Sequence, residues 1–136
     1  MSEYIILKIN IEIPNGPKIP LNRTITVEAY DKIDITVPSG ASDQSVELQP
    51  SESAGQVKFL LVASDWYGGA LSYKVNSDTG TSFELDEPHI LTGEGATAML
   101  DPAPMQLFFT NTTSGEDAED ANVQTLVGRN ATSGSS

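Results

Sequence analysis

Residues 4–13 read YIILKINIEI, and this stretch indicates the fold class of the chain. Apolar side chains occupy every second position from Ile5 to Ile13, and Lys8, Asn10 and Glu12 stand between them. This period of two is typical of a β-strand that buries one face. Four of the five apolar positions are isoleucine, a β-branched residue that favours strands. We therefore expect a strand near the N-terminus with one apolar and one polar side.

The same alternation recurs along the rest of the chain and predicts an all-β protein. Further strands are expected between turns rich in glycine, proline and aspartate, at residues 23–30, 31–38, 45–48, 56–64, 71–75, 82–85, 89–91, 97–100, 106–110 and 121–127. The first two can form a hairpin around residues 30–32 or one long bent strand. A helical turn is an option only at 116–121. Many short strands with frequent turns indicate an antiparallel β-sandwich or a barrel, and we expect the sandwich, jelly-roll-like and built as a single domain.

The length of 136 residues suits one domain. We expect an N-terminal strand and proline-rich arm at residues 1–20, a β-sandwich domain at 21–129 and a flexible tail at 130–136. The core is expected to consist of large apolar residues at alternate positions of four strands: Phe59, Leu61, Leu71, Tyr73, Phe83, Leu85, Leu107 and Phe109.

Composition argues against several classes of function. The formal net charge is −12, from 7 Lys and Arg against 19 Asp and Glu, so the chain repels nucleic acid and anionic lipid. We expect neither a nucleic-acid partner nor a membrane partner. The absence of cysteine excludes disulfides and thiolate chemistry. Charges interrupt the N-terminal strand, and the longest apolar run, Phe59–Ala63, is far too short to span a bilayer, so we expect a soluble chain without a classical export signal.

No catalytic, cofactor-binding or metal-binding residue is predicted, and we expect the protein not to be an enzyme. The single histidine, His89, lies near Asp86 and Glu87, but acid–base or nucleophilic catalysis needs further partners, and the chain has no G-x-S-x-G elbow. We interpret His89 as a surface or strand-edge residue. The acidic residues from Glu116 to Asp120 lack the spacing of an EF-hand loop and indicate a solvated loop.

The N-terminal arm is the first candidate for partner binding, through Ile5, Leu7, Ile9 and Ile11. An alternating strand at the end of a chain can add to the sheet of a neighbour, because main-chain hydrogen bonds supply affinity and alternate side chains fill pockets. The prolines of residues 14–20 suit a sheet edge. The alternative is that this strand lies inside its own sandwich.

The second candidate is the aromatic pair Trp66 and Tyr67, in a turn between two expected strands. Exposed aromatic side chains on such a turn can stack on sugar rings or anchor a partner protein. The alternative is that both side chains fold back and cap the end of the core.

The later part of the chain has a recurring cadence of strands and turns: VKFLLVASD (57–65), LSYKVNSDTGTSFELDEPHILTG (71–93), LFFTNTT (107–113) and ANVQTLVGRNAT (121–132), with ITVPSGASDQSVEL (35–48) before them. This cadence resembles that of small β-sandwich structural proteins of tailed bacteriophages. It is similar in particular to capsid decoration (cement) proteins, with a cyanobacterial phage as a plausible source.

The resemblance implies a virion protein on the outer capsid surface, assembled in the host cytoplasm. Such a protein binds the major capsid protein, forms a homo-oligomer (dimer or trimer), stabilises the shell and uses no cofactor. A tail or fibre module that binds host-surface glycans is the alternative, and a hydrolase domain is the second alternative.

Overall fold

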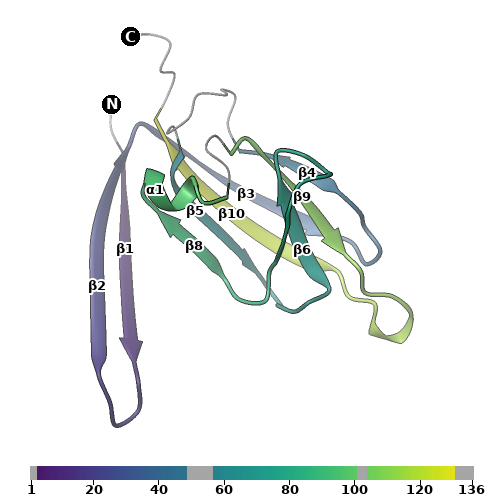
Figure 1. Cartoon of the computed structure of the whole chain (residues 1–136), viewed down its shortest axis with the longest axis horizontal. Helices are drawn as coiled ribbons and strands as arrows, with labels where there is room; N and C mark the ends of the chain where they lie inside the picture. The colour runs from purple at the N-terminus through teal and green to yellow at the C-terminus, as the bar shows by residue number, and fades with distance from the viewer. Residues whose placement is uncertain (1–2, 49–56, 101–103, 131–136) are drawn as a thin grey trace.

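The computed structural model describes residues 3–48, 57–100 and 104–130, which form two packed antiparallel sheets and one projecting hairpin (Figure 1). The hairpin consists of β1 (Glu3–Glu12) and β2 (Lys18–Val27). The first sheet holds β3 (Ala29–Val37), β5 (Val57–Ser64), β8 (His89–Thr92) and β10 (Ala121–Arg129). The second sheet holds β4 (Gln44–Glu47), β6 (Leu71–Val75), β7 (Ser82–Glu84) and β9 (Gln106–Asn111). The predicted antiparallel β-sandwich is confirmed.

The strands are wound in the order of a jelly roll. The first sheet runs β3–β10–β5–β8 and the second runs β4–β9–β6–β7. From β3 onward the chain is folded in half, so that β3 pairs with β10, β4 with β9, β5 with β8 and β6 with β7. This is the winding of the eight-stranded jelly roll, as expected from the many short strands and frequent turns.

The core lies between the two sheets. Tyr73 of β6 is fully buried at its centre, with its ring centroid 5.6 Å from that of Phe109 and 5.8 Å from that of Phe83. Five of the eight expected core residues are buried in this core: Leu71, Tyr73, Leu85, Leu107 and Phe109. Phe83 is only half-buried and packs at the rim of the core.

The expectation that Phe59 and Leu61 form the inward face of β5 is wrong. Leu60 and Val62 belong to the buried core, so Leu61 between them lies on the outer face of the first sheet, where it is half-buried. Phe59 shares that outer face and is buried by the hairpin rather than by the second sheet. Because β5 is apolar on both faces, its residue pattern alone could not distinguish the inner from the outer face.

The expected strand at 97–100 is also wrong. After β8 the chain reverses at Gly93, whose φ is 91°, and forms the short helix α1 (Glu94–Thr97). Thr97 is buried, and its hydroxyl donates a hydrogen bond to the carbonyl oxygen of Val57 at 2.8 Å. This side-chain contact holds the turn against the start of β5. At residues 116–121, where the sequence left a helical turn open, the chain forms only a short 3-10 turn, η1 (Gly115–Asp117).

Residues 23–30 and 31–38 do not form a hairpin with each other. The chain bends at Glu28, whose backbone N–H donates to the carbonyl oxygen of Arg129 at 3.0 Å. Before the bend β2 pairs with β1, and after it β3 pairs with β10. The N-terminal element therefore runs to Val27, beyond the expected arm of residues 1–20.

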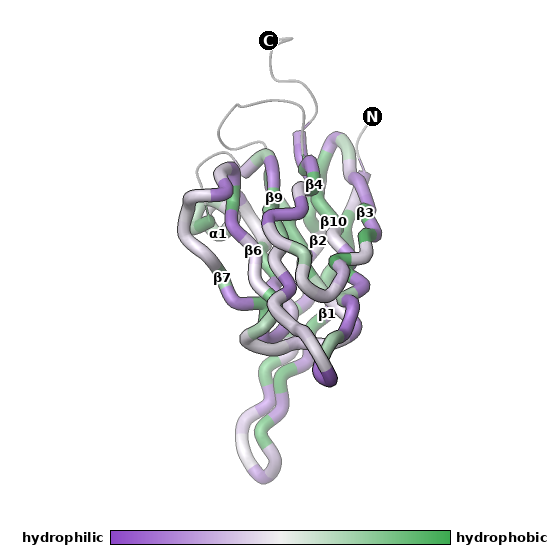
Figure 2. The backbone as a smooth tube through the Cα atoms, turned by 90° about the vertical axis from the view of Figure 1, so that its right-hand side faces the viewer, coloured by the Kyte–Doolittle hydropathy of each residue, from purple (hydrophilic) through white to green (hydrophobic). Residues whose placement is uncertain are grey.

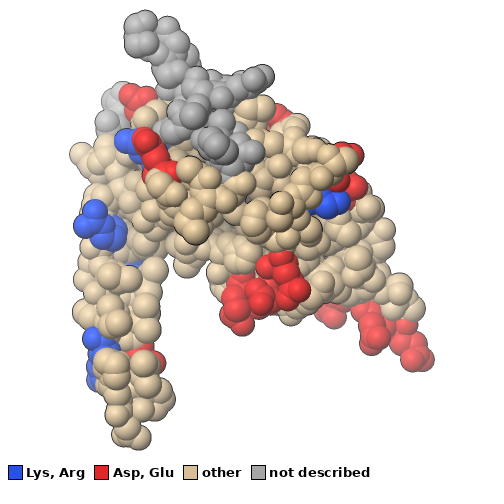
Figure 3. All heavy atoms as spheres, in the orientation of Figure 1, with Lys and Arg blue, Asp and Glu red and all other residues tan. Residues whose placement is uncertain are grey.

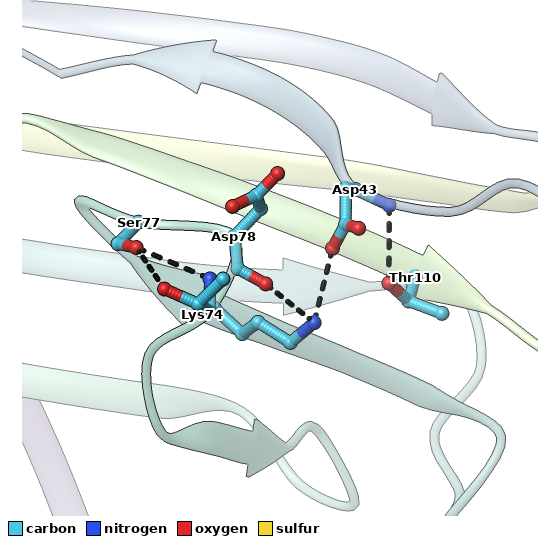
Figure 4. Close-up of polar contacts among 6 residues, drawn as sticks. Asp43, Lys74, Ser77, Asp78 and Thr110 are labelled. Carbon is cyan, nitrogen blue, oxygen red and sulfur yellow. Dashed lines mark hydrogen bonds and ion pairs between the residues drawn. The ribbon is translucent and has the colours of Figure 1, made fainter.

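Polar contacts brace the second sheet (Figure 4). The Nζ atom of Lys74 in β6 lies 3.1 Å from the Oδ1 atom of Asp43 and donates to the carbonyl oxygen of Asp78 at 3.0 Å. The backbone N–H of Asp43 donates to the hydroxyl of Thr110 in β9 at 3.2 Å. The loop before β4 is thereby tied to β6 and β9, and the charge of Lys74 is neutralised within the fold.

Candidate functional site

The β1–β2 hairpin is a two-stranded ribbon that projects from the sandwich (Figure 1). Among the described strands, β1 pairs with β2 alone, so it is not an interior strand of the sandwich. The turn is closed by two hydrogen bonds, from Gly16 N–H to the Ile13 carbonyl oxygen at 2.7 Å and from Ile13 N–H to the Pro17 carbonyl oxygen at 3.0 Å. A two-stranded ribbon is marginally stable by itself in water, so the attachment of its base to the body matters.

The ribbon has two different faces. Cross-strand pairing brings to one face, here called the apolar face, the side chains of Ile5, Leu7, Ile9 and Ile11 from β1 and of Ile19, Leu21, Arg23 and Ile25 from β2. The other face is mostly polar, although Tyr4 and Ile6 lie on it and are each 67% exposed. Figure 2 shows hydrophobic and hydrophilic residues alternating along the ribbon.

The apolar face is open to solvent toward the tip of the hairpin. Ile11 is 44% exposed, and its cross-strand partner Ile19 is similarly exposed, as is Leu21 opposite Ile9. The structure thus brings together all four arm residues predicted from the sequence. It adds the returning strand β2, which begins in the proline-rich stretch expected as a sheet edge and continues into residues expected as a separate strand at 23–30. The apolar residues Ile19, Leu21 and Ile25 lie at the even spacing of a strand face.

The base of the hairpin is anchored on the outer face of the first sheet at Gly128. A Cβ atom built on Gly128 would come within 2.6 Å of Ile5 Cδ1 and 3.0 Å of Val27 Cγ1. Val27 is fully buried, and Phe59 beside it is nearly so. The absence of a side chain at position 128 therefore lets the ribbon approach the sheet closely.

Charge is distributed unevenly between the hairpin and the body. Residues 3–27 hold three cations (Lys8, Lys18, Arg23) and two anions, a net +1, whereas the remainder of the chain holds four cations and seventeen anions, a net −13. Figure 3 shows blue atoms along the hairpin and red atoms gathered on the lower side of the body. The hairpin is thus weakly basic, whereas the rest of the chain taken together is strongly acidic.

The hairpin cations are also unpaired within the described structure. Three of the four body cations form ion pairs: Lys32 with Asp34, Lys74 with Asp43 and Arg129 with Asp31. None of the three hairpin cations lies within ion-pair distance of a carboxylate in the described residues.

A groove of 460 Å³ runs beside the hairpin base. Its lining includes Arg23 and Thr24 of β2, Lys58 of β5 and Glu94 of α1. Two cations and one carboxylate form no catalytic set, and no group of three or more histidine, cysteine, aspartate or glutamate side chains suited to a metal occurs among the described residues. We therefore interpret the groove as the space left where the hairpin meets the body, and not as a catalytic site.

His89 supports the core and does not lie free on the surface. Its Nδ1 atom is 2.6 Å from the hydroxyl oxygen of Tyr73, and the two rings meet edge to face at 5.5 Å. Burial raises the pKa of Tyr73, because a phenolate would lose its hydration inside the core. The His89 ring is half-buried at the edge of the first sheet and supplies the hydrogen-bond partner that this buried hydroxyl requires.

Trp66 and Tyr67 pack against the end of the core. Both side chains are half-buried. The indole N–H of Trp66 donates to the carbonyl oxygen of Asp120 at 2.9 Å, and the hydroxyl of Tyr67 accepts from the backbone N–H of Ser64 at 3.1 Å. This is the capping arrangement, and the role of the pair in partner binding stays a prediction.

The acidic loop is held by a residue that sequence reasoning missed, Asn111. Its buried amide donates to the carbonyl oxygens of Val37 at 3.0 Å and Glu119 at 2.7 Å, and its Oδ1 atom accepts from the hydroxyl of Thr113 at 2.7 Å. The loop carboxylates of Glu116 and Asp117 lie exposed on η1. The sequence could have indicated this role, because Asn111 is a polar residue at an inward-facing position of β9, where the other inward-facing residues, Leu107 and Phe109, are apolar.

Comparisons with known proteins find no matching family model, no matching curated protein and no matching solved structure. Within the part of the chain that the structure describes, no helix is long and apolar enough to cross a membrane.

Proposed function

We propose that this chain is a structural protein of a bacteriophage particle, a decoration protein that binds the outer surface of the capsid and stabilises the shell. The observation that carries the proposal is the projecting β1–β2 hairpin, whose apolar face is open to solvent toward its tip. A contiguous apolar surface of this kind on a small acidic chain marks an interaction site. The partner is the major capsid protein, and the protein itself forms a homo-oligomer.

Two further features support this proposal. The jelly roll is a common architecture of viral capsid domains, although it also occurs in lectins, so this support is a fold-level analogy. The net charge of −12 opposes contact with packaged nucleic acid and suits a position outside the shell. Because copies repel one another, adhesion must come from apolar burial and backbone pairing, repeated over many sites of the particle.

The proposal is tested with a protein whose hairpin is shortened but whose anchor is retained. Residues 8–22 are replaced by a two-residue Asn-Gly turn, which keeps Ile5, Ile25 and Val27 on the body. We expect this variant to remain folded and to lose cosedimentation with empty capsids of the source phage. The matched control is Ile6→Asp, on the opposite face of β1, which should cosediment like the unaltered protein.

Full binding by the folded, shortened variant would show that the capsid contact lies elsewhere. The alternative function, a tail or fibre module that binds host glycans, depends on Trp66 and Tyr67. That function predicts glycan binding that disappears in Trp66→Ala and persists in the shortened hairpin.

A further inference from the structure

The turn at the tip of the hairpin contains the only asparagine–glycine pair of the chain, Asn15–Gly16. It lies at the end of the ribbon that is farthest from the body (Figure 1). Asn15 has a left-handed backbone, with φ at 61°, and the N–H of Gly16 donates to the carbonyl oxygen of Ile13 at 2.7 Å. Proline at the second position, here Pro14, and a left-handed residue at the third are the pattern of a type II turn.

An asparagine followed by glycine holds both reactants of an intramolecular reaction. The backbone nitrogen of Gly16 can attack the side-chain carbonyl carbon of Asn15, because a five-membered ring closes and glycine has no Cβ atom in the path. A bond forms between Gly16 N and Asn15 Cγ, and the bond from Cγ to Nδ2 breaks. Nδ2 leaves as ammonia with the proton of the Gly16 N–H. One water molecule then opens the ring and gives either aspartate or isoaspartate, whose backbone runs through the former side chain.

The side-chain amide of Asn15 is free to approach Gly16, because it forms no hydrogen bond with any described residue. The chain has six other asparagines, and none of them precedes a glycine. Four of the six have side chains held by hydrogen bonds to described residues: Asn10, Asn76, Asn111 and Asn122. Sequence and structure therefore both single out Asn15.

Asn76 is the closest comparison within the chain. Its backbone is also left-handed, with φ at 65°. Its Oδ1 atom, however, accepts hydrogen bonds from the backbone N–H groups of Met105 at 2.7 Å and Gln106 at 3.1 Å. The following residue is serine, whose side chain hinders the approach of the backbone nitrogen. Asn76 should therefore keep its amide.

The closed turn restrains the reaction at Asn15. The hydrogen bond to Ile13 occupies the Gly16 N–H, and a second bond joins Ile13 N–H to the Pro17 carbonyl oxygen at 3.0 Å. Every residue from 11 to 20 is exposed, so no core packing opposes the loss of these two bonds. Two-stranded ribbons are marginally stable, and local opening of such tips costs little free energy. Brief openings of the turn therefore release the Gly16 nitrogen.

We propose that Asn15 is a site of spontaneous deamidation, at which the hairpin tip modifies itself at a rate set by opening of the turn between Ile13 and Gly16. Aspartate tolerates the left-handed conformation and preserves the turn, whereas isoaspartate lengthens the backbone by one carbon atom and opens it. Either product adds one negative charge and takes residues 3–27 from a net charge of +1 to 0. The inference does not depend on the proposed function and concerns the purified chain.

The first test incubates the unaltered full chain at neutral pH and about 37 °C, because asparagine is thermolabile. The tryptic peptide of residues 9–18 should gain about one mass unit, since an NH₂ group becomes OH. Fragmentation should place the change at Asn15 and leave Asn10 of the same peptide unaltered. Asn15→Gly, which suits a positive φ, is the control and should gain no mass. An unchanged mass after several weeks, or an earlier change at another asparagine, would overturn the inference.

The second test addresses control by the turn. Pro14→Ala gives the open turn more freedom, so opening should become about two- to fivefold more frequent. The Asn15–Gly16 pair itself is unchanged in this variant. Deamidation and hydrogen exchange of the Gly16 N–H should therefore both accelerate by the same factor. Pro88→Ala, at an exposed position of the body, is the control and should leave both rates unchanged. Equal deamidation rates in Pro14→Ala and the unaltered chain would show that the turn does not control the reaction.

The third test separates the added charge from the altered backbone. Asn15→Asp carries the charge on a normal backbone and should keep the slow hydrogen exchange of the Gly16 N–H. The isoaspartate form, isolated from incubated protein by chromatography, should exchange this N–H faster. Equal exchange in the two forms would overturn the claim that isoaspartate opens the turn.

Discussion

Gly128 lies directly beneath Ile5, so closely that a Cβ atom at position 128 would come 2.6 Å from the Cδ1 atom of Ile5. The two residues are far apart in the sequence and join the projecting hairpin to the last strand of the sandwich. Val27, at the end of the hairpin, would lie 3.0 Å from the same Cβ atom. The hairpin is therefore oriented by a close backbone approach that only glycine permits without displacement.

Gly128→Ala should loosen this anchor. The added methyl group would crowd Ile5 and the stiff side chain of Val27, and overpacking of this kind costs about 1–3 kcal/mol. Chemical denaturation should show this loss, and hydrogen exchange should show faster exchange in β1 and β2. Gly95→Ala, whose Cβ would meet nothing within 4 Å, is the control and should not reduce stability. Equal stability of both variants would show that the hairpin is not held at Gly128.

Leu60 and Leu61 form a matched pair for the two faces of β5. Leu60 is fully buried between the sheets, so Leu60→Ala should cost about 2–5 kcal/mol. Leu61 is half-buried on the outer face, and Leu61→Ala should cost clearly less. Urea unfolding of the two variants checks the order, and a larger loss for Leu61→Ala would contradict the face assignment.

His89→Ala should destabilise the protein by about 1–3 kcal/mol, because it leaves the buried hydroxyl of Tyr73 without its partner. Tyr73→Phe removes that hydroxyl, so adding His89→Ala to Tyr73→Phe should cost less than His89→Ala alone. A double-mutant cycle by thermal unfolding measures the coupling. Additive losses would show that the two residues do not interact.

Alkaline pH should act on Tyr73 in a defined direction. Burial raises the pKa of its hydroxyl above the ordinary value of 10.0, so above pH 10 the unfolded chain ionises while the folded chain does not. The contribution of this group to stability is complete below pH 10 and is lost as the pH rises further. Denaturation midpoints across this range should fall in the unaltered protein and fall less in Tyr73→Phe.

Acid pH should act on Asp65. Its carboxylate accepts hydrogen bonds from the backbone N–H of Asn122 at 3.0 Å and from the Asn122 side-chain amide at 2.8 Å, which lower its pKa from 3.8. A lowered pKa in the folded state stabilises the protein above pH 3.8, and this contribution is lost as the pH falls through the folded-state pKa. The midpoint of unfolding should therefore depend less on pH in Asp65→Asn between pH 5 and 2. An unchanged pH profile would show that these hydrogen bonds do not favour the carboxylate.

Much of this architecture is local and could be predicted from the sequence. Side chains alternate across a strand because of backbone geometry, so residues 71–75 and 106–110 were recognised as strands and Tyr73 and Phe109 as core residues. The apolar character of the hairpin's first strand was visible for the same reason.

Tertiary structure alone decided which strands pair and which side chains meet. Residues 19–27 alternate like a sandwich strand, yet they pair only with β1. The chain then bends at Glu28, and the residues after the bend join the first sheet of the sandwich. β5 is apolar on both faces, so the second sheet and the hairpin together determined which side Leu60 faces. Contacts such as Tyr73 with His89 and Ile5 with Gly128 join residues from different elements. An amino-acid pattern with a period of two carries no information about such contacts, because it describes each strand and not the strand's neighbours.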